Sequence, residues 1–232
     1  MNQAQKVYSS LLEAFSGQTD PPELSLFHAR FLAKDRQEIE RRCLEAFGPP
    51  DTGEAGARAT AARPHRAVLV ATQVIEQSLD LDFDVMVTEM APVDLLLQRS
   101  GRLRRHQRAD RGGPPDGPLL HILPPALDAN ALPKFDRAST FVYDEHILLR
   151  TWYALQGRET VRVPEDVEGL IEAVYAESSE PPPGASPPLV ERWRASWRVM
   201  EQKRIGLEAI ASQPLVPGPQ FDPEEFFEMD RT

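Results

Sequence analysis

Closely spaced arginines near residue 100 carry the strongest chemical signal in the sequence. The block reads QRSGRLRR and covers residues 98–105. A guanidinium is always charged and offers a planar fork of donors, which suits phosphate oxygens. Transfer of a γ-phosphoryl group to water spreads negative charge over such oxygens, and a cation held there stabilises that charge. Arg99, Arg102 and Arg105 recur at every third position, so we expect them near one face of a helix or a tight turn.

Two uncharged residues of the same block could complete such a site. Gln98 could hold a water molecule or a phosphate oxygen, and Gly101 would let the backbone come close to a ligand. The alternative is that the block is only the solvated, basic end of a helix. The elements around it must decide between these interpretations.

Those elements are typical of a parallel-sheet domain. A buried-strand pattern covers residues 67–71, a polar turn follows over residues 72–80, and a second apolar run covers residues 85–87. A helix that begins at about Val93 then leads into the arginines. This order predicts phosphate-handling groups at the carboxyl ends of the strands. We therefore expect Arg102 and Arg105 at those ends, in one cleft with Arg30 and Thr72.

The stretch from residue 66 to residue 106 resembles the second RecA-like domain of superfamily 2 helicases. QRSGRLRR resembles their motif VI, and VLVATQVIEQSLDLD resembles their motif V. The wording ATQVIEQSLDLDFD, with a motif VI that ends in Arg-His, is closer to one family, the CRISPR-associated helicase-nuclease of type I systems. Arg104 stands where many helicases have glycine, a departure that is common in that family.

The resemblance implies a role for each matching residue, in three groups. Residues expected to act on the transferred phosphoryl group are Arg102, Arg105 and Gln98. Residues expected to bind the nucleotide are Arg99, Gly101, Asp80 and Glu76. Residues expected to contact nucleic acid are Arg30, His28, Thr72, Gln73 and Gln77. The alternate acids Asp80, Asp82 and Asp84 could instead form a solvated turn or a metal site, and we predict no metal there.

The charge, cysteine content and apolar runs of the sequence limit the kinds of partner that we expect. The net charge is −10, so nothing draws the whole chain to nucleic acid, and contact must come from a local patch such as the arginine block. A single cysteine predicts no disulfide and fits a reducing cytoplasm. No apolar run approaches the length that spans a bilayer, so we expect no membrane partner.

The predicted fold is α/β: a RecA-like, three-layer domain with a parallel sheet, followed by a mostly helical C-terminal region. We expect the helicase domain over residues 1–123, a helical extension over 124–177, a proline-rich linker over 178–188, and a helix and tail over 189–232. By resemblance, the helix that opens the chain follows a strand in the family. The first strand of the domain is therefore expected to be missing.

The phosphate loop and the nuclease residues of a working helicase-nuclease are also expected on other domains. The sequence contains no G-x-x-x-x-G-K phosphate loop, and its five histidines are scattered without nuclease-like pairing. The resemblance implies the second motor domain of an ATP-dependent, 3′-to-5′ single-stranded DNA translocase that degrades invading DNA with a crRNA-guided surveillance complex. ATP would bind with Mg²⁺, whose ligands belong to the missing first RecA-like domain, and the chain alone would be inactive. The alternatives are another superfamily 2 DNA or RNA helicase, or a non-catalytic remnant that binds DNA or a protein complex.

Overall fold

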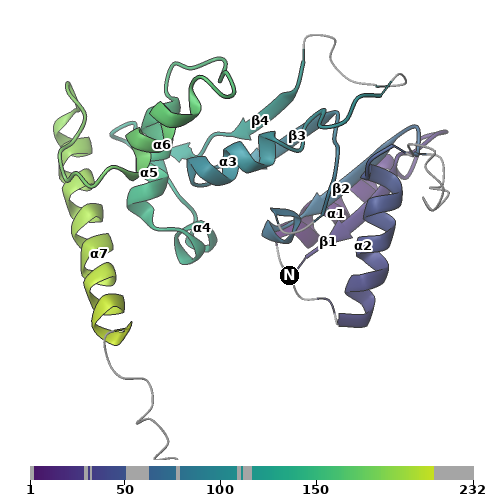
Figure 1. Cartoon of the computed structure of the whole chain (residues 1–232), viewed down its shortest axis with the longest axis horizontal. Helices are drawn as coiled ribbons and strands as arrows, with labels where there is room; N and C mark the ends of the chain where they lie inside the picture. The colour runs from purple at the N-terminus through teal and green to yellow at the C-terminus, as the bar shows by residue number, and fades with distance from the viewer. Residues whose placement is uncertain are drawn as a thin grey trace, which may run out of the picture.

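A computed structural model shows an α/β protein with a helical C-terminal region (Figure 1). It describes residues 3–28, 31, 33–50, 63–76, 79–108, 111 and 117–211. In chain order the elements are α1 (Gln3–Phe15), β1 (Glu23–Phe27), α2 (Ala33–Phe47), β2 (Ala67–Ala71), the 3-10 helix η1 (Gln73–Glu76), β3 (Val85–Glu89), α3 (Val93–Ser100), β4 (Leu119–Leu123), β5 (Ala126–Leu127), β6 (Pro133–Lys134), α4 (Arg137–Val142), α5 (Glu145–Leu155), α6 (Val167–Tyr175) and α7 (Pro187–Ala211).

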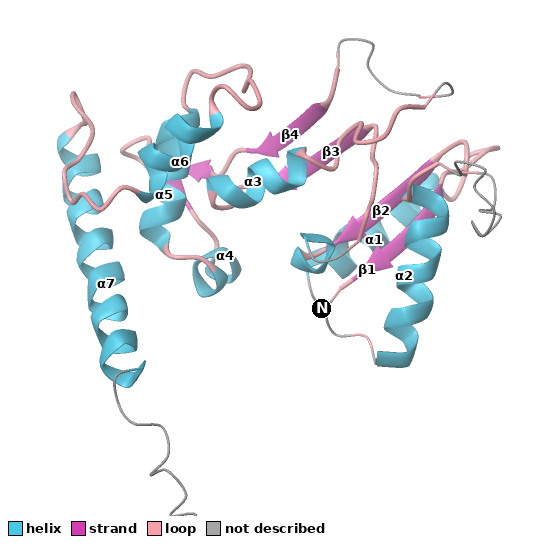
Figure 2. Cartoon of the chain, viewed as in Figure 1, coloured by secondary structure: helices cyan, strands magenta, loops and turns pink. Residues whose placement is uncertain are grey.

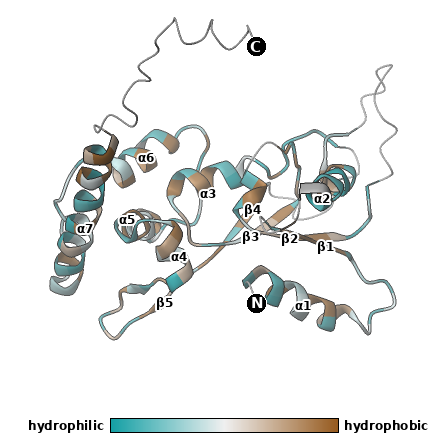
Figure 3. Ribbon diagram, turned by 90° about the horizontal axis from the view of Figure 1, so that it is seen from below, coloured by the Kyte–Doolittle hydropathy of each residue, from teal (hydrophilic) through white to brown (hydrophobic). Residues whose placement is uncertain are grey.

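The strands confirm the parallel arrangement but not one continuous sheet. β1 pairs in parallel with β2, and β3 pairs in parallel with β4. Among the described strands, no ladder joins β2 to β3. The two pairs nevertheless lie in one layer, in the order β4, β3, β2, β1 (Figures 1 and 3).

Helices cover both faces of this layer, as the three-layer prediction requires. α2 and α3 lie on one side and α1 lies on the other (Figure 3). The core under α2 is built from the apolar residues of the predicted strands and helices. Phe27, Cys43, Phe47, Leu81 and Phe83 are all buried in it. Burying such side chains contributes roughly 1.5–3 kcal/mol each, and this burial positions the loops that carry the polar motifs.

The C-terminal region is mostly helical (Figure 2). It also contains a small antiparallel hairpin of β5 and β6. The helical path is interrupted between α4 and α5, where Tyr143 is extended (φ −120°). α7 buries Leu189 and Trp193 near its beginning, whereas Leu207 further along is 67% exposed. Within the described chain, no helix combines the length and the apolar character that crossing a bilayer demands.

Candidate functional site

Arg99, in the last turn of α3, ties three segments of the chain together. Its Nε donates to the Glu76 carboxylate at 2.9 Å, and its Nη1 donates to the Thr88 hydroxyl at 2.6 Å. Its Nη2 lies 3.4 Å from the Tyr143 hydroxyl. The side chains of Arg99 and Glu76 are each only 12% exposed, so water screens their attraction weakly. This guanidinium therefore holds η1, β3 and the α4–α5 junction in place.

Arg102 points into the protein. It is 9% exposed. Its Nη1 donates to the Leu79 carbonyl, and its Nη2 donates to the Glu76 carbonyl at 2.9 Å. Burial lowers the pKa of Arg102 from its ordinary value, and the nearby charge of Arg105 lowers it further. The guanidinium is thus already engaged, and its evident task is to fix the backbone that follows η1.

Arg105 reaches solvent instead. Its side chain is 48% exposed, and its Nε lies 3.0 Å from the carboxylate of Asp80, which is itself 45% exposed. Exposed ion pairs of this kind contribute about 0–1 kcal/mol, so the Asp80–Arg105 pair can open for an anion at little cost. Gln98 and Gly101 are exposed as well. These residues are the part of the block that solvent reaches.

Two of the three arginines lie beyond the helix, yet all three reach the same segment of the chain. Arg99 and Arg102 both bond to Glu76, and Arg105 pairs with Asp80. α3 stops at Ser100, and the Gly101 N–H donates to the Leu97 carbonyl at 3.0 Å to cap it. Arg104 then has a φ of 49°, in the left-handed region. The helical period therefore stops before Arg102, and the spacing of three no longer sets direction.

The expectation that Arg102 and Arg105 lie at the carboxyl ends of the strands is also wrong. Leu103 pairs with Phe83, which precedes β3, through the bonds Phe83 N to Arg102 O and Arg104 N to Phe83 O, both 2.9 Å. α3 has eight residues and carries the chain back along β3 by about 12 Å. Arg99 stays near the carboxyl end of β3, but Arg102 and Arg105 lie toward its amino end.

The carboxyl ends of β1 and β2 bring two of the expected nucleic-acid residues together. Phe27 is in register with Ala71, so His28 and Thr72 follow at adjacent strand ends. The Thr72 N–H donates to the Phe27 carbonyl at 3.1 Å. His28 is buried, and its ring stacks on Phe31 with centroids 4.1 Å apart. Thr72 is half-buried, and its hydroxyl remains a candidate phosphate ligand.

Gln73 is exposed and connects this edge to the C-terminal region. Its Nε2 donates to the Tyr143 hydroxyl at 3.3 Å, the same hydroxyl that lies beside Arg99. Sequence reasoning missed Tyr143, because nothing in the pattern around it signals a contact with residues 44 and 70 positions earlier. Arg30 and Gln77 lie outside the described residues.

Asp82 is a buried carboxylate that accepts hydrogen bonds from several arginines, and it is not part of a solvated turn. Its carboxylate is 0% exposed and accepts from Arg108 Nε at 3.0 Å, Arg111 Nη2 at 2.7 Å and the Arg105 backbone N–H at 2.9 Å. Burial alone would raise the pKa of Asp82, but the hydrogen bonds from Arg111 and Arg108 hold it below its ordinary value. Over the described ranges, no group of three or more His, Cys, Asp and Glu residues is placed to hold a metal ion.

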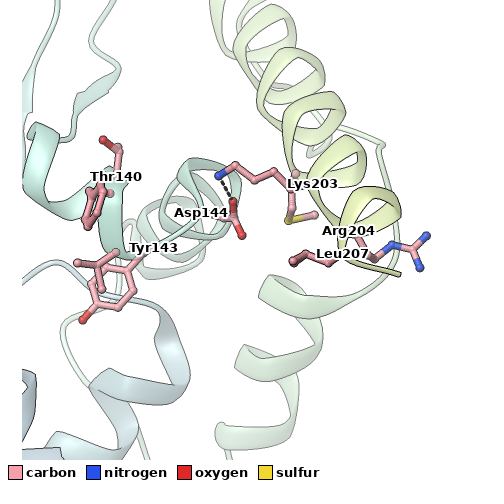
Figure 4. A pocket seen from close by; sticks show the side chains of 9 residues that line it. Thr140, Tyr143, Asp144, Lys203, Arg204 and Leu207 are labelled. Carbon is pink, nitrogen blue, oxygen red and sulfur yellow. Dashed lines mark hydrogen bonds and ion pairs between the residues drawn. The ribbon is translucent and has the colours of Figure 1, made fainter. Parts of the chain in front are cut away.

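A separate shallow pocket of about 390 Å³ lies between the α4–α5 junction and α7 (Figure 4). Its lining is largely apolar and includes Phe141, which is 91% exposed. Lys203 Nζ forms an ion pair with Asp144 at 2.7 Å across it. Its second cation, Arg204, is paired with Glu201 and Glu208. With both cations already paired, this pocket is a poor phosphate site, and it shares only Tyr143 with the network around Arg99.

Comparisons with known proteins identify the family. The family model described as "CRISPR-associated nuclease/helicase Cas3, C-terminal" matches residues 1–108. The Cas3 endonuclease/helicase of Thermus thermophilus is 41% identical over 186 residues, which is 80% of this chain. The chain belongs to the Cas3 family. It covers only 18% of that relative, and 15% of the Cas3 of Streptococcus thermophilus.

Solved Cas3 structures share the fold. The crystal structure of T. fusca Cas3 superposes with a TM-score of 0.69 at 39% identity, over 88% of this chain and 21% of that one. A crystal structure described as a CRISPR-associated protein reaches a TM-score of 0.74 at 46% identity, over 89% of this chain and 22% of that one. Other T. fusca Cas3 structures are described with ADP, AMPPNP or ATP. The resemblance to a superfamily 2 helicase of CRISPR systems is thus confirmed.

Proposed function

We propose that this chain supplies the second motor domain of an ATP-dependent helicase that moves 3′-to-5′ on single-stranded DNA during CRISPR interference. The observation that carries the proposal is that the arginines of the block differ in their contacts and exposure. Arg99 and Arg102 are anchored to η1 and the loop after it, and Arg105 is left exposed beside Asp80. A buried scaffold that presents one exposed guanidinium, held only by a solvated ion pair, suits stabilisation of a transferring phosphoryl group.

Arg105 and Gln98 are the residues that we assign to the γ-phosphate, and Asp80 to the nucleotide. MgATP supplies the phosphoryl group, and its metal ligands and phosphate loop are assigned to a first RecA-like domain. Asp80 would release Arg105 when the more highly charged triphosphate arrives. Gly101, with a φ of −65°, leaves room for the ligand because it has no side chain there.

The same scaffold offers a route from nucleotide to DNA. Arg102 and Arg99 hold the carbonyl and the carboxylate of Glu76, at the end of η1. Thr72 and Gln73 precede and open η1 at the carboxyl end of β2, where we place the DNA phosphates. A shift of the arginines on ATP hydrolysis would therefore move the residues that contact the strand.

The partners follow from the relatives. One similar structure, with a TM-score of 0.59 and 35% identity, is described as a CRISPR RNA-guided surveillance complex, pre-nicking. We propose the same kind of crRNA-guided complex as the partner of the whole enzyme, with nuclease activity supplied by another domain. The T. fusca Cas3 structure described with ATP supports ATP as the nucleotide that the enzyme hydrolyses.

The test compares the isolated chain with a full-length polypeptide that contains it. We expect DNA-stimulated ATP hydrolysis only from the full-length protein. Arg105→Ala there should lower the rate about 10³-fold or more, as expected for an arginine that stabilises the transition state. Arg194→Ala, which removes an exposed arginine on α7, is the matched control and should leave the rate unchanged.

Two results would contradict the proposal. Clear ATP hydrolysis by the purified chain alone, lost on Arg102→Ala, would show a self-sufficient site. DNA-stimulated hydrolysis that survives Arg105→Ala in the full-length protein would remove Arg105 from the nucleotide site. Stimulation by RNA instead of DNA would contradict single-stranded DNA as the substrate, and binding without turnover in the full-length protein would favour a non-catalytic remnant.

A further inference from the structure

The carboxylate of Asp80 has two partners on a single oxygen atom, and only one of them is an arginine. Asp80 Oδ1 lies 3.0 Å from Arg105 Nε and 3.0 Å from His106 Nε2. An ionised carboxylate accepts hydrogen bonds and cannot donate them, so Nε2 is the imidazole nitrogen that carries the proton. The roles proposed above use Asp80 and Arg105 and leave His106 without a task.

The backbone that carries the imidazole of His106 is anchored on both sides. The Arg105 N–H, just before it, donates to Asp82 Oδ1 at 2.9 Å, and the His106 carbonyl accepts from Arg111 Nη2. Asp82 is 0% exposed and pairs with Arg111 at 2.7 Å, so both anchors belong to one buried network. This network fixes the position from which the imidazole reaches Asp80.

The two partners of Asp80 differ in length and exposure. The side chain of Arg105 is 48% exposed, whereas that of His106 is 24% exposed. A long, flexible side chain loses more rotamer freedom when it is held in one place, so Arg105 is the partner that is released more easily. His106 is therefore the partner that stays with Asp80 when Arg105 moves.

We propose that His106 is a positioning residue of the nucleotide site, which keeps Asp80 hydrogen-bonded while Arg105 leaves that carboxylate for the triphosphate. The inference rests on the proposed function, in which ATP draws Arg105 away from Asp80. A donor on Oδ1 offsets part of the negative charge there, so Asp80 attracts Arg105 less strongly while His106 is bound. Without His106, the departure of Arg105 would leave an uncompensated carboxylate beside an incoming polyanion, and these like charges repel.

The test measures the KM for ATP and the kcat of DNA-stimulated hydrolysis in a full-length polypeptide that contains this chain. We expect His106→Ala to raise KM about two- to fivefold, the range of an exposed ion pair. The kcat should stay unchanged, because Arg105 is released when ATP binds and not at the chemical step. His106→Gln keeps an N–H donor and should restore the wild-type KM. The matched control is His65→Ala, which removes an exposed histidine ahead of β2 and should change neither quantity.

A double variant shows whether His106 acts through Asp80. In Asp80→Asn the side chain no longer carries the charge that holds Arg105. Adding His106→Ala should therefore leave KM at the value of Asp80→Asn alone, the non-additive result expected of residues in contact. An equal rise of KM with and without the Asp80 carboxylate would overturn the inference, because His106 would then act on the nucleotide by another route.

A purely structural role of His106 would give a different pattern. Partial unfolding lowers the concentration of active protein, so the apparent kcat of His106→Ala would fall at an unchanged KM, and that result would overturn the inference. If the alanine variant does not fold, His106→Phe replaces it, because phenylalanine keeps a ring without the N–H; it should show the same rise in KM.

The same measurements separate this inference from the proposed function. Hydrolysis that is lost on Arg105→Ala but keeps the wild-type KM in His106→Ala and His106→Phe would overturn the role of His106 alone. Absence of hydrolysis from the wild-type full-length protein would overturn the proposed function, and the role of His106 with it.

Discussion

Replacement of Arg102 and Arg105 by alanine, one at a time, separates the anchored arginine from the exposed one. Arg102 is 9% exposed and donates to the carbonyls of Leu79 and Glu76. Hydrogen bonds from charged groups contribute about 1.5–3 kcal/mol each, and their loss leaves two carbonyls with poor access to water. We therefore expect Arg102→Ala to lower the free energy of unfolding by about 3 kcal/mol.

Arg105→Ala should cost far less. Its pair with Asp80 has side chains 48% and 45% exposed, and such pairs contribute at most about 1 kcal/mol. Urea unfolding followed by far-ultraviolet circular dichroism measures both changes. With a slope of about 2 kcal/mol per M, Arg102→Ala should shift the midpoint by about 1.5 M and Arg105→Ala by less than about 0.5 M.

The conservative variant Arg102→Lys sharpens the comparison. A lysine lacks the planar fork and can serve one carbonyl well but not both, so its midpoint should fall between the wild type and Arg102→Ala. Equal shifts for Arg102→Ala and Arg105→Ala, or a larger shift for Arg105→Ala, would show that the division between anchor and exposed guanidinium is mistaken.

Two other predictions concern buried charge. Burial, with a smaller effect of the Arg150 charge, lowers the pKa of His146 from 6.5 to about 4. As the pH falls, His146 of the unfolded chain therefore takes up a proton before His146 of the folded protein does. The folded protein loses stability as the pH falls from 6.5 toward 4. Between pH 7.5 and 5 the wild type should lose about 2 kcal/mol more than His146→Gln, and parallel pH profiles would contradict the burial of a neutral imidazole. Asp82→Asn should cost about 3 kcal/mol at pH 7, because it removes the buried carboxylate that Arg108 and Arg111 share and leaves Arg111 with only the Asp84 carboxylate. The depressed pKa of Asp82 places the acid loss of its own contribution below the pH range of the His146 effect. A urea midpoint unchanged at pH 7 would refute this buried network.

Regular elements could be predicted from the sequence because burial imposes a period on the chain. The apolar run at residues 67–71 becomes β2 with the expected limits, and a helix begins at Val93 as expected. The end of α2 at Phe47 has a local cause as well, since Gly48 and two prolines follow it. Each of these features depends on residues close together in the chain.

The directions of the site residues could not be predicted in this way. The spacing of three does not reveal that Arg102 is buried and Arg105 is exposed, because α3 ends at Ser100 and the helical period stops there. The burial of Asp82 depends on Arg108 and Arg111, 26 and 29 residues away, and an alternating acidic stretch does not reveal such partners. The break in the sheet likewise depends on segments distant in sequence.

The phenol of Tyr143 has a consequence for how the C-terminal helices and the motor domain respond to each other. One hydroxyl, at the junction of α4 and α5, lies 3.3 Å from Gln73 and 3.4 Å from Arg99. Hydrogen bonds weaken steeply once donor and acceptor separate, so an ångström of displacement at that junction would break both contacts of Tyr143 at once. The C-terminal helices could therefore detach from both motifs while Arg99 keeps its bonds to Glu76 and Thr88.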